Sequence, residues 1–201
     1  GTSRSGLAAC SYGDDKGIFG YGSAGPVSTT NLVSNTGVIG TDVSGVGTAR
    51  ETLAACEYGD DKGIFGYGDT GSKTAVTNLV SNTGVVATDT SGVGTARNYL
   101  AACGYGGDKG IFGYGDTTGV SSSLTNLVSN TGVVATDTTG VGTARSGLAA
   151  TQYDGDKGIF GYGNTASKVS MTNLVSNAGV VGTDVTGVGT ARAYLAACSY
   201  N

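Results

Sequence analysis

Two segments of the chain carry the glycine spacing of dinucleotide-binding loops, G-x-G-x-x-G. They begin at Gly20 and Gly66, each within an identical heptapeptide, KGIFGYG. In dinucleotide-binding proteins this loop opens a helix, whose N-terminal amides hold the pyrophosphate. No helical periodicity follows either match, and the copies of KGIFGYG at 109–115 and 157–163 break the pattern. We therefore predict that no nucleotide, and no other cofactor, binds at these glycines.

The chain contains no histidine. This removes the usual general base near neutral pH, the commonest zinc ligand and every Ser-His-Asp or Cys-His arrangement. The cysteines lie at least 46 residues apart, at Cys10, Cys56, Cys103 and Cys198. Thr151 takes the corresponding place in the remaining repeat, so we expect small buried fillers with free thiols. We predict a protein that is not an enzyme, with no catalytic, cofactor-binding or metal-binding residues.

Carboxylates precede a lysine at the same point of each repeat. Asp14-Asp15, Asp60-Asp61 and Asp154-Gly155-Asp156 could supply oxygen ligands to Ca²⁺, although none completes a D-x-D-x-D-G loop. We favour the alternative, in which they are solvated turn charges paired with the lysine. A separate aspartate precedes each of four arginines by eight residues, as Asp42 precedes Arg50. We expect each guanidinium to donate hydrogen bonds to loop carbonyls or to an aspartate between neighbouring repeats.

The composition argues against several classes of partner. With 11 Lys and Arg among 201 residues and a formal charge of −4, no basic stripe could follow a phosphate backbone, so we predict no nucleic-acid binding. No apolar run approaches the roughly 20 residues that cross a bilayer, so we predict no membrane insertion. The polar start GTSRSG is not a signal peptide, although a processed chain would have lost one, so the compartment stays open.

One unit of about 47 residues is repeated along the chain. All five arginines lie at the same point of this unit, at Arg4, Arg50, Arg97, Arg145 and Arg192. A unit reads R-x-x-L-A-A-C, then x-Y-G-x-D-K-G-I-F-G-Y-G, a variable stretch, T-N-L-V-S-N-T-G-V-V and x-T-D-x-[ST]-G-V-G-T-A-R. We predict a single repeat domain, 1–201, with units at 4–49, 50–96, 97–144 and 145–191 and an extra strand at 192–201.

Each unit predicts four short β-strands. In the second unit they are Leu53 to Tyr58, Gly63 to Tyr67, Thr77 to Ser81 and Gly84 to Asp89, separated by residues that tolerate positive φ. The connections are short enough for an antiparallel meander. Since successive side chains of a strand point to opposite faces, Ile and Phe of KGIFGYG should bury apolar area on both sides of the sheet.

A repeated four-stranded unit of about 40 to 50 residues is typical of a β-propeller blade. The order of arginine, small apolar strand, glycine-rich K-G-I-F-G-Y-G strand and two further strands resembles the kelch repeat. It is also similar to glycine-rich repeats in tail-fibre-like structural proteins of bacteriophages. The resemblance implies an all-β propeller of four antiparallel blades, with the Leu-Ala-Ala-Cys strands around the axis. It also implies a structural role on a virion or outside the cell.

The copies differ mainly in two loops, which an up-and-down blade brings to one face. One follows KGIFGYG, and the other holds the two residues after each arginine. A rigid scaffold with one varied loop face is a common design of binding modules, although exposed loops also vary when nothing constrains them. The candidate residues for ligand binding or assembly are Asp69, Lys73, Tyr99, Asp116, Asn164, Lys168 and Tyr194.

The chain holds five Leu-Ala-Ala strands but four copies of every other strand. An unpaired strand is a template for another strand. We therefore predict that Ala193 to Asn201, or the matching Ser3 to Tyr12, pairs with a second copy of the chain or with a missing continuation of the same polypeptide, giving a larger ring or an open head-to-tail array. The predicted function is that of a non-enzymatic structural or adhesive repeat protein that self-assembles through its terminal strands. The alternative is a lectin-like or protein-binding module that binds a glycan or a surface protein through the variable face.

Overall fold

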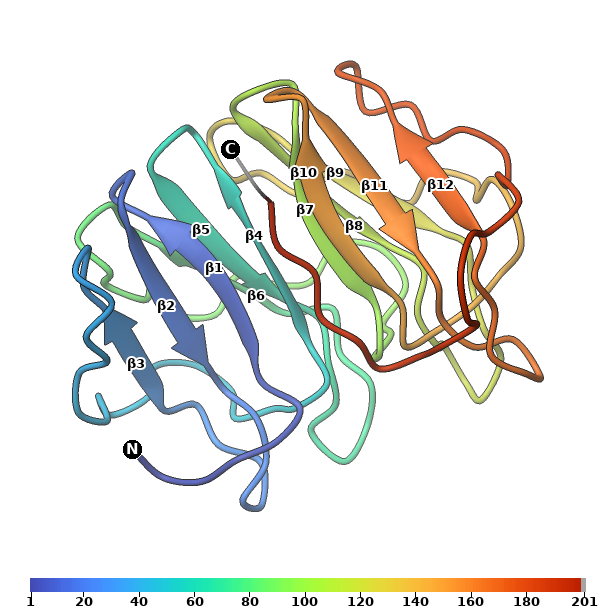
Figure 1. Cartoon of the computed structure of the whole chain (residues 1–201). Coiled ribbons are helices and arrows are strands. Elements are labelled where there is room, and N and C mark those ends of the chain that lie inside the picture. The colour runs from blue at the N-terminus through green and yellow to red at the C-terminus, as the bar shows by residue number, and fades with distance from the viewer. Residues whose placement is uncertain (200–201) are drawn as a thin grey trace.

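The structure, a computed structural model, describes residues 1–199, and these contain β-strands and no helix, hence nothing helical that could span a membrane. The strands form four separate three-stranded antiparallel sheets, one for each repeat (Figure 1). In chain order the sheets are β1 (Ala8–Tyr12), β2 (Lys16–Gly20), β3 (Thr30–Val33); β4 (Ala54–Tyr58), β5 (Lys62–Gly66), β6 (Thr77–Val80); β7 (Ala101–Tyr105), β8 (Lys109–Gly113), β9 (Thr125–Val128); and β10 (Ala149–Tyr153), β11 (Lys157–Gly161), β12 (Thr172–Val175). The predicted all-β class and the first three strands of each unit are confirmed.

Each sheet is a meander whose first turn needs a left-handed backbone. In the second sheet Tyr58 lies opposite Lys62 across the turn between β4 and β5. Gly59 and Asp60 in this turn have φ of 58° and 66°, a region that glycine and aspartate tolerate better than most residues. The sequence Tyr-Gly-Asp-Asp-Lys therefore fixes the register of the hairpin.

The predicted fourth strand is wrong as a regular strand. The segment runs beside β6 but makes only isolated bridges, Val80 with Val86 and Thr77 with Thr90. Between them Nδ2 of Asn78 donates to the carbonyl of Ala87 at 3.0 Å, so a side chain occupies an acceptor that a ladder would use. The other units repeat this arrangement. A unit is therefore a three-stranded sheet with an irregular outer segment.

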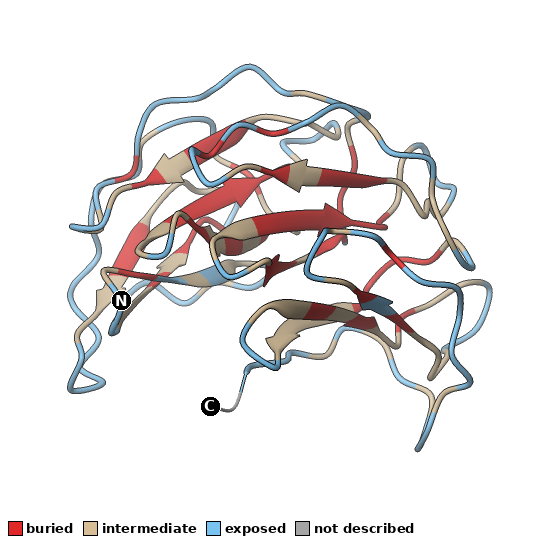
Figure 2. Ribbon diagram, turned by 90° about the horizontal axis from the view of Figure 1, so that it is seen from above, coloured by how far each residue is buried: buried red, intermediate tan, exposed pale blue. Residues whose placement is uncertain are grey.

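The sheets follow one another in an arc (Figure 2). Their first strands lie side by side in chain order, β1 beside β4, β4 beside β7 and β7 beside β10. Figure 1 shows the third strands on the opposite, outer side. The first and last sheets form the two ends of the arc, so each of these two sheets has a neighbouring sheet on one side only.

The apolar core is divided into three layers, one between each pair of neighbouring sheets. Phe65 lies in the layer toward the first sheet and Ile64 in the layer toward the third, and both are fully buried. This confirms the prediction that the second strand buries apolar area on both faces. At the ends of the arc the corresponding side chains, Phe19 and Ile159, are only partly buried.

Candidate functional site

The contact between two successive sheets, called the junction here, is built around one phenylalanine. Phe65 of the second sheet packs edge-on against Tyr21 of the first, with ring centroids 5.2 Å apart. Its ring lies over Gly20, where an added Cβ would be 2.6 Å from Cζ of Phe65. The same arrangement joins the second sheet to the third and the third to the fourth. Burying such a ring stabilises by about 1.5 to 3 kcal/mol, and the aromatic pair adds about 0.5 to 1.5 kcal/mol.

A buried arginine lies across each junction. The guanidinium of Arg50 stacks 4.1 Å from the centroid of the Tyr21 ring, and its Nε donates to the carbonyl of Tyr67 at 2.8 Å. Burial lowers the pKa of Arg50, while the nearby Tyr21 and Asp89 oppose that shift. In the junction of the third and fourth sheets, Arg145 also donates to Oδ1 of Asn173 at 2.6 Å. The predicted donation to carbonyls is confirmed, whereas the asparagine and the tyrosine ring were not predicted.

A threonine and an aspartate close the rim of each junction. Thr48 donates through its amide and Oγ1 to Oδ2 of Asp89, at 3.1 and 2.6 Å. Asp89 also accepts from Nδ2 of Asn78 at 2.9 Å. Desolvation alone would raise the pKa of Asp89, but the hydrogen bonds from Thr48 and Asn78 outweigh it and the pKa is lowered. Asp89, eight residues before Arg97, therefore stabilises the junction that contains Arg50 and not the one that contains Arg97.

The last sheet presents one half of a further junction. Arg192 already stacks on Tyr162, 4.5 Å from its centroid. A Cβ added to Gly161 would meet only Cγ2 of Thr172, at 3.4 Å, because no phenylalanine ring lies over this glycine. A pocket of about 250 Å³ opens here, lined by Gly161, Tyr162 and Arg192 among others. Tyr153 is only partly buried, whereas its counterparts in the other sheets are buried.

The first sheet presents the other half. Phe19 is partly exposed, whereas its three counterparts are fully buried. Gly37 has no atom within 4 Å of an added Cβ, although its counterparts each lie against a tyrosine of the preceding sheet. Thr2 donates to Oδ2 of Asp42, and Arg4 donates to Oδ1 of Asn31, as in an internal junction. The two ends of the arc thus carry complementary halves of the contact that the chain makes three times internally.

Three of the predicted site residues take part in contacts between neighbouring repeats. Nζ of Lys73 lies 2.5 Å from Oδ1 of Asp116, and Nδ2 of Asn98 donates to Oδ2 of Asp69 at 3.0 Å. Asn164 has the position of Asp69 and Asp116 in the last unit, and Lys168 has that of Lys73. Asn164 bridges to Ser146, and Lys168 lines a separate outer pocket with Asp184.

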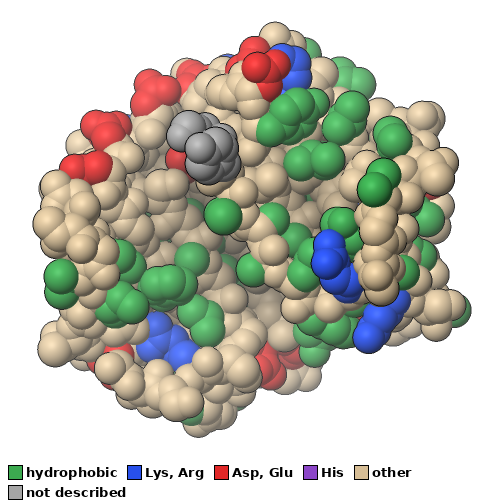
Figure 3. All heavy atoms as spheres, in the orientation of Figure 1, with side chains coloured by type: hydrophobic (Ala, Val, Ile, Leu, Met, Phe, Trp, Pro, Cys, Tyr) green, Lys and Arg blue, Asp and Glu red, His purple; other side chains and the backbone are tan. Residues whose placement is uncertain are grey.

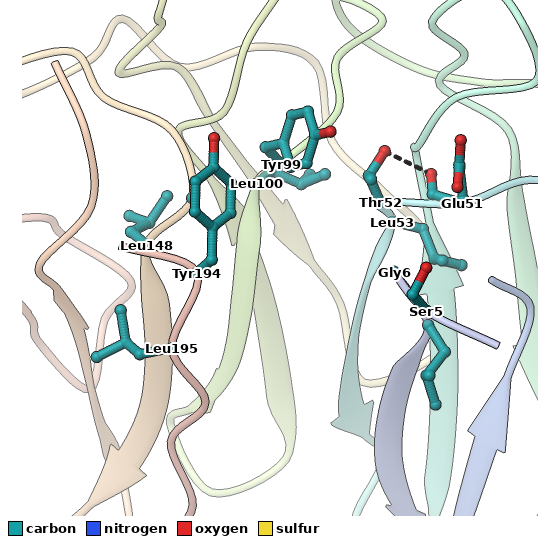
Figure 4. Close-up of a pocket in the computed structure, with 12 residues that line it drawn as sticks. Ser5, Gly6, Glu51, Thr52, Leu53, Tyr99, Leu100, Leu148, Tyr194 and Leu195 are labelled. Atoms are coloured by element: carbon teal, nitrogen blue, oxygen red, sulfur yellow. Dashed lines mark hydrogen bonds between the residues drawn. The ribbon is translucent and has the colours of Figure 1, made fainter. Parts of the chain in front are cut away.

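The structure brings the other two predicted residues, Tyr99 and Tyr194, together where the segments leading into the first strands of the repeats meet (Figure 4). Their rings pack edge-on with centroids 5.6 Å apart, and they are 39% and 67% exposed. They line a pocket of about 450 Å³ together with Glu51, Leu100 and other residues. The residues predicted from the variable loops therefore belong to two different places in the structure, the rim of the junctions and this pocket.

The backbone around this pocket forms a ladder across the repeats. The amide of Thr52 donates to the carbonyl of Gly6 at 2.7 Å, that of Tyr99 to Thr52 at 2.9 Å, that of Gly147 to Tyr99 at 2.9 Å and that of Tyr194 to Gly147 at 2.7 Å. All five residues have φ between 51° and 61°. A threonine and two tyrosines in this region cost about 1 to 3 kcal/mol each, which the surrounding hydrogen bonds must offset.

The cysteines lie in the junctions, except for the last. A Cβ added to Gly110 would be 2.6 Å from Sγ of Cys56, so this thiol fills the space over the next sheet. Burial raises the pKa of Cys10 and of Cys103 to about 12, which keeps these thiols protonated and unreactive. Cys198 is exposed, and all four thiols are free.

Charged side chains are sparse on the surface (Figure 3). Acidic residues gather along one edge of the face shown, and each turn lysine pairs with the preceding aspartate, as Lys16 does with Asp15 at 2.6 Å. The prediction of paired, solvated turn charges is confirmed for this pair. Among residues 1–199, no group of three Cys, Asp or Glu side chains is arranged to hold a metal ion.

No protein-family model matches the chain, and a search of curated proteins finds no significant match.

Proposed function

We propose that the protein is a non-enzymatic structural or adhesive building block of the kind displayed on virions or cell surfaces. Its four sheets are the blades of an open β-propeller, and copies associate end to end, the first sheet of one chain on the last sheet of the next. The observation that carries this proposal is the pair of complementary half-junctions at the two ends of the arc.

The fit of the two ends is supported by the three internal junctions, which use the same residue types. In an end-to-end contact Phe19 enters the pocket over Gly161 and packs on Tyr162. Tyr153 covers Gly37. Such a contact is heterologous, so it forms a closed ring if the rotation closes and an open array if it does not. Between separate chains it must also offset about 4 to 15 kcal/mol of lost translational and rotational freedom, so association should increase with chain concentration.

The test is the mass of the chain in solution, measured by light scattering over a range of concentrations. We expect assemblies larger than the 19.7 kDa chain. Gly161→Ala should weaken them, because its new Cβ takes the space of the Phe19 ring, whereas it leaves the single chain folded. Val180→Ser, at a side chain that is 65% exposed, is the matched control and should leave assembly unchanged. A wild-type chain that stays monomeric at every concentration contradicts the proposal.

A second candidate function is supported by the pocket between Tyr99 and Tyr194. Exposed aromatic faces next to a carboxylate could stack on the apolar face of a sugar and accept hydrogen bonds from its hydroxyls. A glycan array with the wild-type chain and with Tyr194→Ala tests this module. Saturable binding that Tyr194→Ala abolishes supports it, and equal signals from the two proteins contradict it.

A further inference from the structure

Two segments of the chain have the same sequence pattern, T-x-R-x-x-L-A-A-C. We call residues 2–10 the N-terminal arm and residues 190–198 the C-terminal arm. Internal segments such as 48–56 follow the same pattern and show what an arm does when both neighbouring sheets are present. Such a segment leaves one sheet, spans the junction and becomes the first strand of the next sheet.

The C-terminal arm has completed the first half of this path. Arg192 stacks on Tyr162, its carbonyl accepts the amide of Gly163 at 2.9 Å, and the amide of Tyr194 donates to Gly147 at 2.7 Å. These are the contacts that an internal arm makes with the sheet before it. The following residues, Leu195 to Cys198, form no strand, and the last three of them are exposed. This arm lacks the sheet that it would extend.

The N-terminal arm has completed only the second half. Its β1 pairs along the whole of β2, and Thr2 and Arg4 bond to Asp42 and Asn31. However, Arg4 is the one arginine of the five that is not stacked on a tyrosine ring. Its side chain is 5% exposed, its buried Nε and Nη1 have no hydrogen-bond partner, and Nη1 lies 3.8 Å from Oδ1 of Asp42 as an ion pair. Buried guanidinium groups left in this state are costly.

The internal junctions show the contacts that Arg4 lacks. All three internal guanidinium groups lie over the tyrosine ring of the preceding sheet, and Nε of Arg50 and of Arg145, though not of Arg97, donates to a tyrosine carbonyl. Arg192 brings such a ring with it, because it is already stacked on Tyr162. On the first sheet Arg192 would therefore keep the tyrosine ring that Arg4 lacks and could also bond to Asn31 and Asp42.

From these observations we propose that copies assemble by strand exchange. The C-terminal arm of one chain pairs with β2 of the next chain and bonds to Asn31 and Asp42 there, in place of that chain's own N-terminal arm. The two arms therefore compete for a single binding place. This inference rests on the proposed end-to-end association and adds its regulation, since the N-terminal arm is a built-in competitor that must leave before the partner's arm can bind. Both arms cannot occupy the same edge of β2.

The exchange makes opposite predictions for equivalent arginines. Arg4→Ala removes a charge-assisted hydrogen bond of the competitor and should strengthen association roughly tenfold. Arg192→Ala removes the group that the incoming arm brings and should weaken association by a similar factor. Ser3→Ala, at an exposed residue of the N-terminal arm, is the matched control and should change nothing.

The measurement is the apparent dissociation constant from light scattering or sedimentation, with circular dichroism to verify that each variant is folded. A second variant, lacking residues 1–5, removes most of the competitor's side-chain contacts while keeping β1 and should associate at least as tightly as Arg4→Ala. If wild type associates and Gly161→Ala weakens it, but Arg4→Ala and the deletion have no effect or weaken association, the exchange is wrong and the proposed function stands. If no variant associates at any concentration, both are wrong.

Discussion

Replacing one glycine of KGIFGYG by alanine should have opposite effects in the second and fourth repeats. At Gly66 the added Cβ would lie 2.7 Å from Cζ of Phe112 and 3.0 Å from its Cε1. The ring cannot move aside, because Phe112 is fully buried and packs edge-on against Tyr67 at 5.2 Å. At Gly161 the same atom would meet a single methyl group at 3.4 Å. The two substitutions are identical in chemistry and in position within the repeat, and they differ only in whether a following sheet is present.

The magnitudes follow from packing and from the unfolded chain. Overpacking at Gly66 costs about 1 to 3 kcal/mol. Neither glycine has a positive φ, so alanine adds no backbone strain and lowers the entropy of the unfolded chain, which stabilises by about 0.4 to 1 kcal/mol. We therefore expect Gly66→Ala to lose up to about 2.5 kcal/mol net, and Gly161→Ala to be neutral or to gain up to about 1 kcal/mol. For a chain of this size 1 kcal/mol corresponds to about 2 to 4 °C in Tm.

The assay is thermal and urea unfolding followed by circular dichroism, at a concentration where light scattering shows single chains. Gly113→Ala, whose Cβ would lie 2.6 Å from Cζ of Phe160, serves as an internal repeat of Gly66→Ala and should reproduce its loss. Equal effects of Gly66→Ala and Gly161→Ala would refute the reasoning, since they would mean that the phenylalanine ring does not require the glycine beneath it.

Three further predictions concern thiols, acid and the inner strands. In the native chain Cys198 should react with a thiol reagent at pH 8, while Cys10 and Cys103 stay protected by their raised pKa. In urea all four cysteines of the chain should react alike. Fast reaction of Cys103 in the native state would contradict its burial. The pKa of Asp42 is lowered to about 2, and that of Asp89 is also lowered. The stabilisation from these carboxylates is therefore present above the unfolded pKa near 3.8 and is lost as pH falls through the folded pKa. The urea midpoint should drop between about pH 4 and pH 2, and it should drop less in Asp89→Asn. A midpoint that does not change with pH would argue against these hydrogen-bonded pairs. Ala101→Leu, at a side chain that is 6% exposed in the layer between the third and fourth sheets, should destabilise by about 1 to 3 kcal/mol, and an unchanged melt would place this strand at the surface.

The first three strands of each unit could be predicted because their signals are local. Alternation of side chains and a Gly-Asp turn determine β4 and β5 and their register without reference to any other repeat. The fourth strand could not be predicted correctly, because its ladder is interrupted by the side chain of Asn78, which lies on the neighbouring strand. In isolation the letters T-G-V-V-A-T favour a strand.

The candidate site was predicted in part. Variation between the copies drew attention to Lys73 and Asp116, and the structure pairs these two side chains as an ion pair across one junction. Loop variation therefore indicated contact rather than a free binding surface at this place. Tyr99 and Tyr194 are different, since their rings meet across an intervening repeat around a pocket that no single repeat reveals. The predicted strand at 192–201 is wrong for residues 192–199, which form no strand, and residues 200 and 201 lie outside the described residues.

The invariance of KGIFGYG follows from the junction. Within one copy of KGIFGYG, the Ile side chain packs toward the following sheet and the Phe side chain toward the preceding sheet. The glycine before Tyr lies under the Phe ring of the next copy, and the Tyr ring packs edge-on against that same Phe ring. At an internal junction a change in one copy therefore alters a contact whose other half lies in the neighbouring copy, and it can be compensated only there. At the tip of the loop after KGIFGYG, Gly71 and Gly119 have no atom within 4 Å of an added Cβ, so a Cβ there would contact no other copy, although their φ of 100° and 83° favours glycine. The two ends of the arc carry the same residue types as the internal junctions, with Phe19 at one end and Gly161, Tyr162 and Arg192 at the other, so the two ends are complementary.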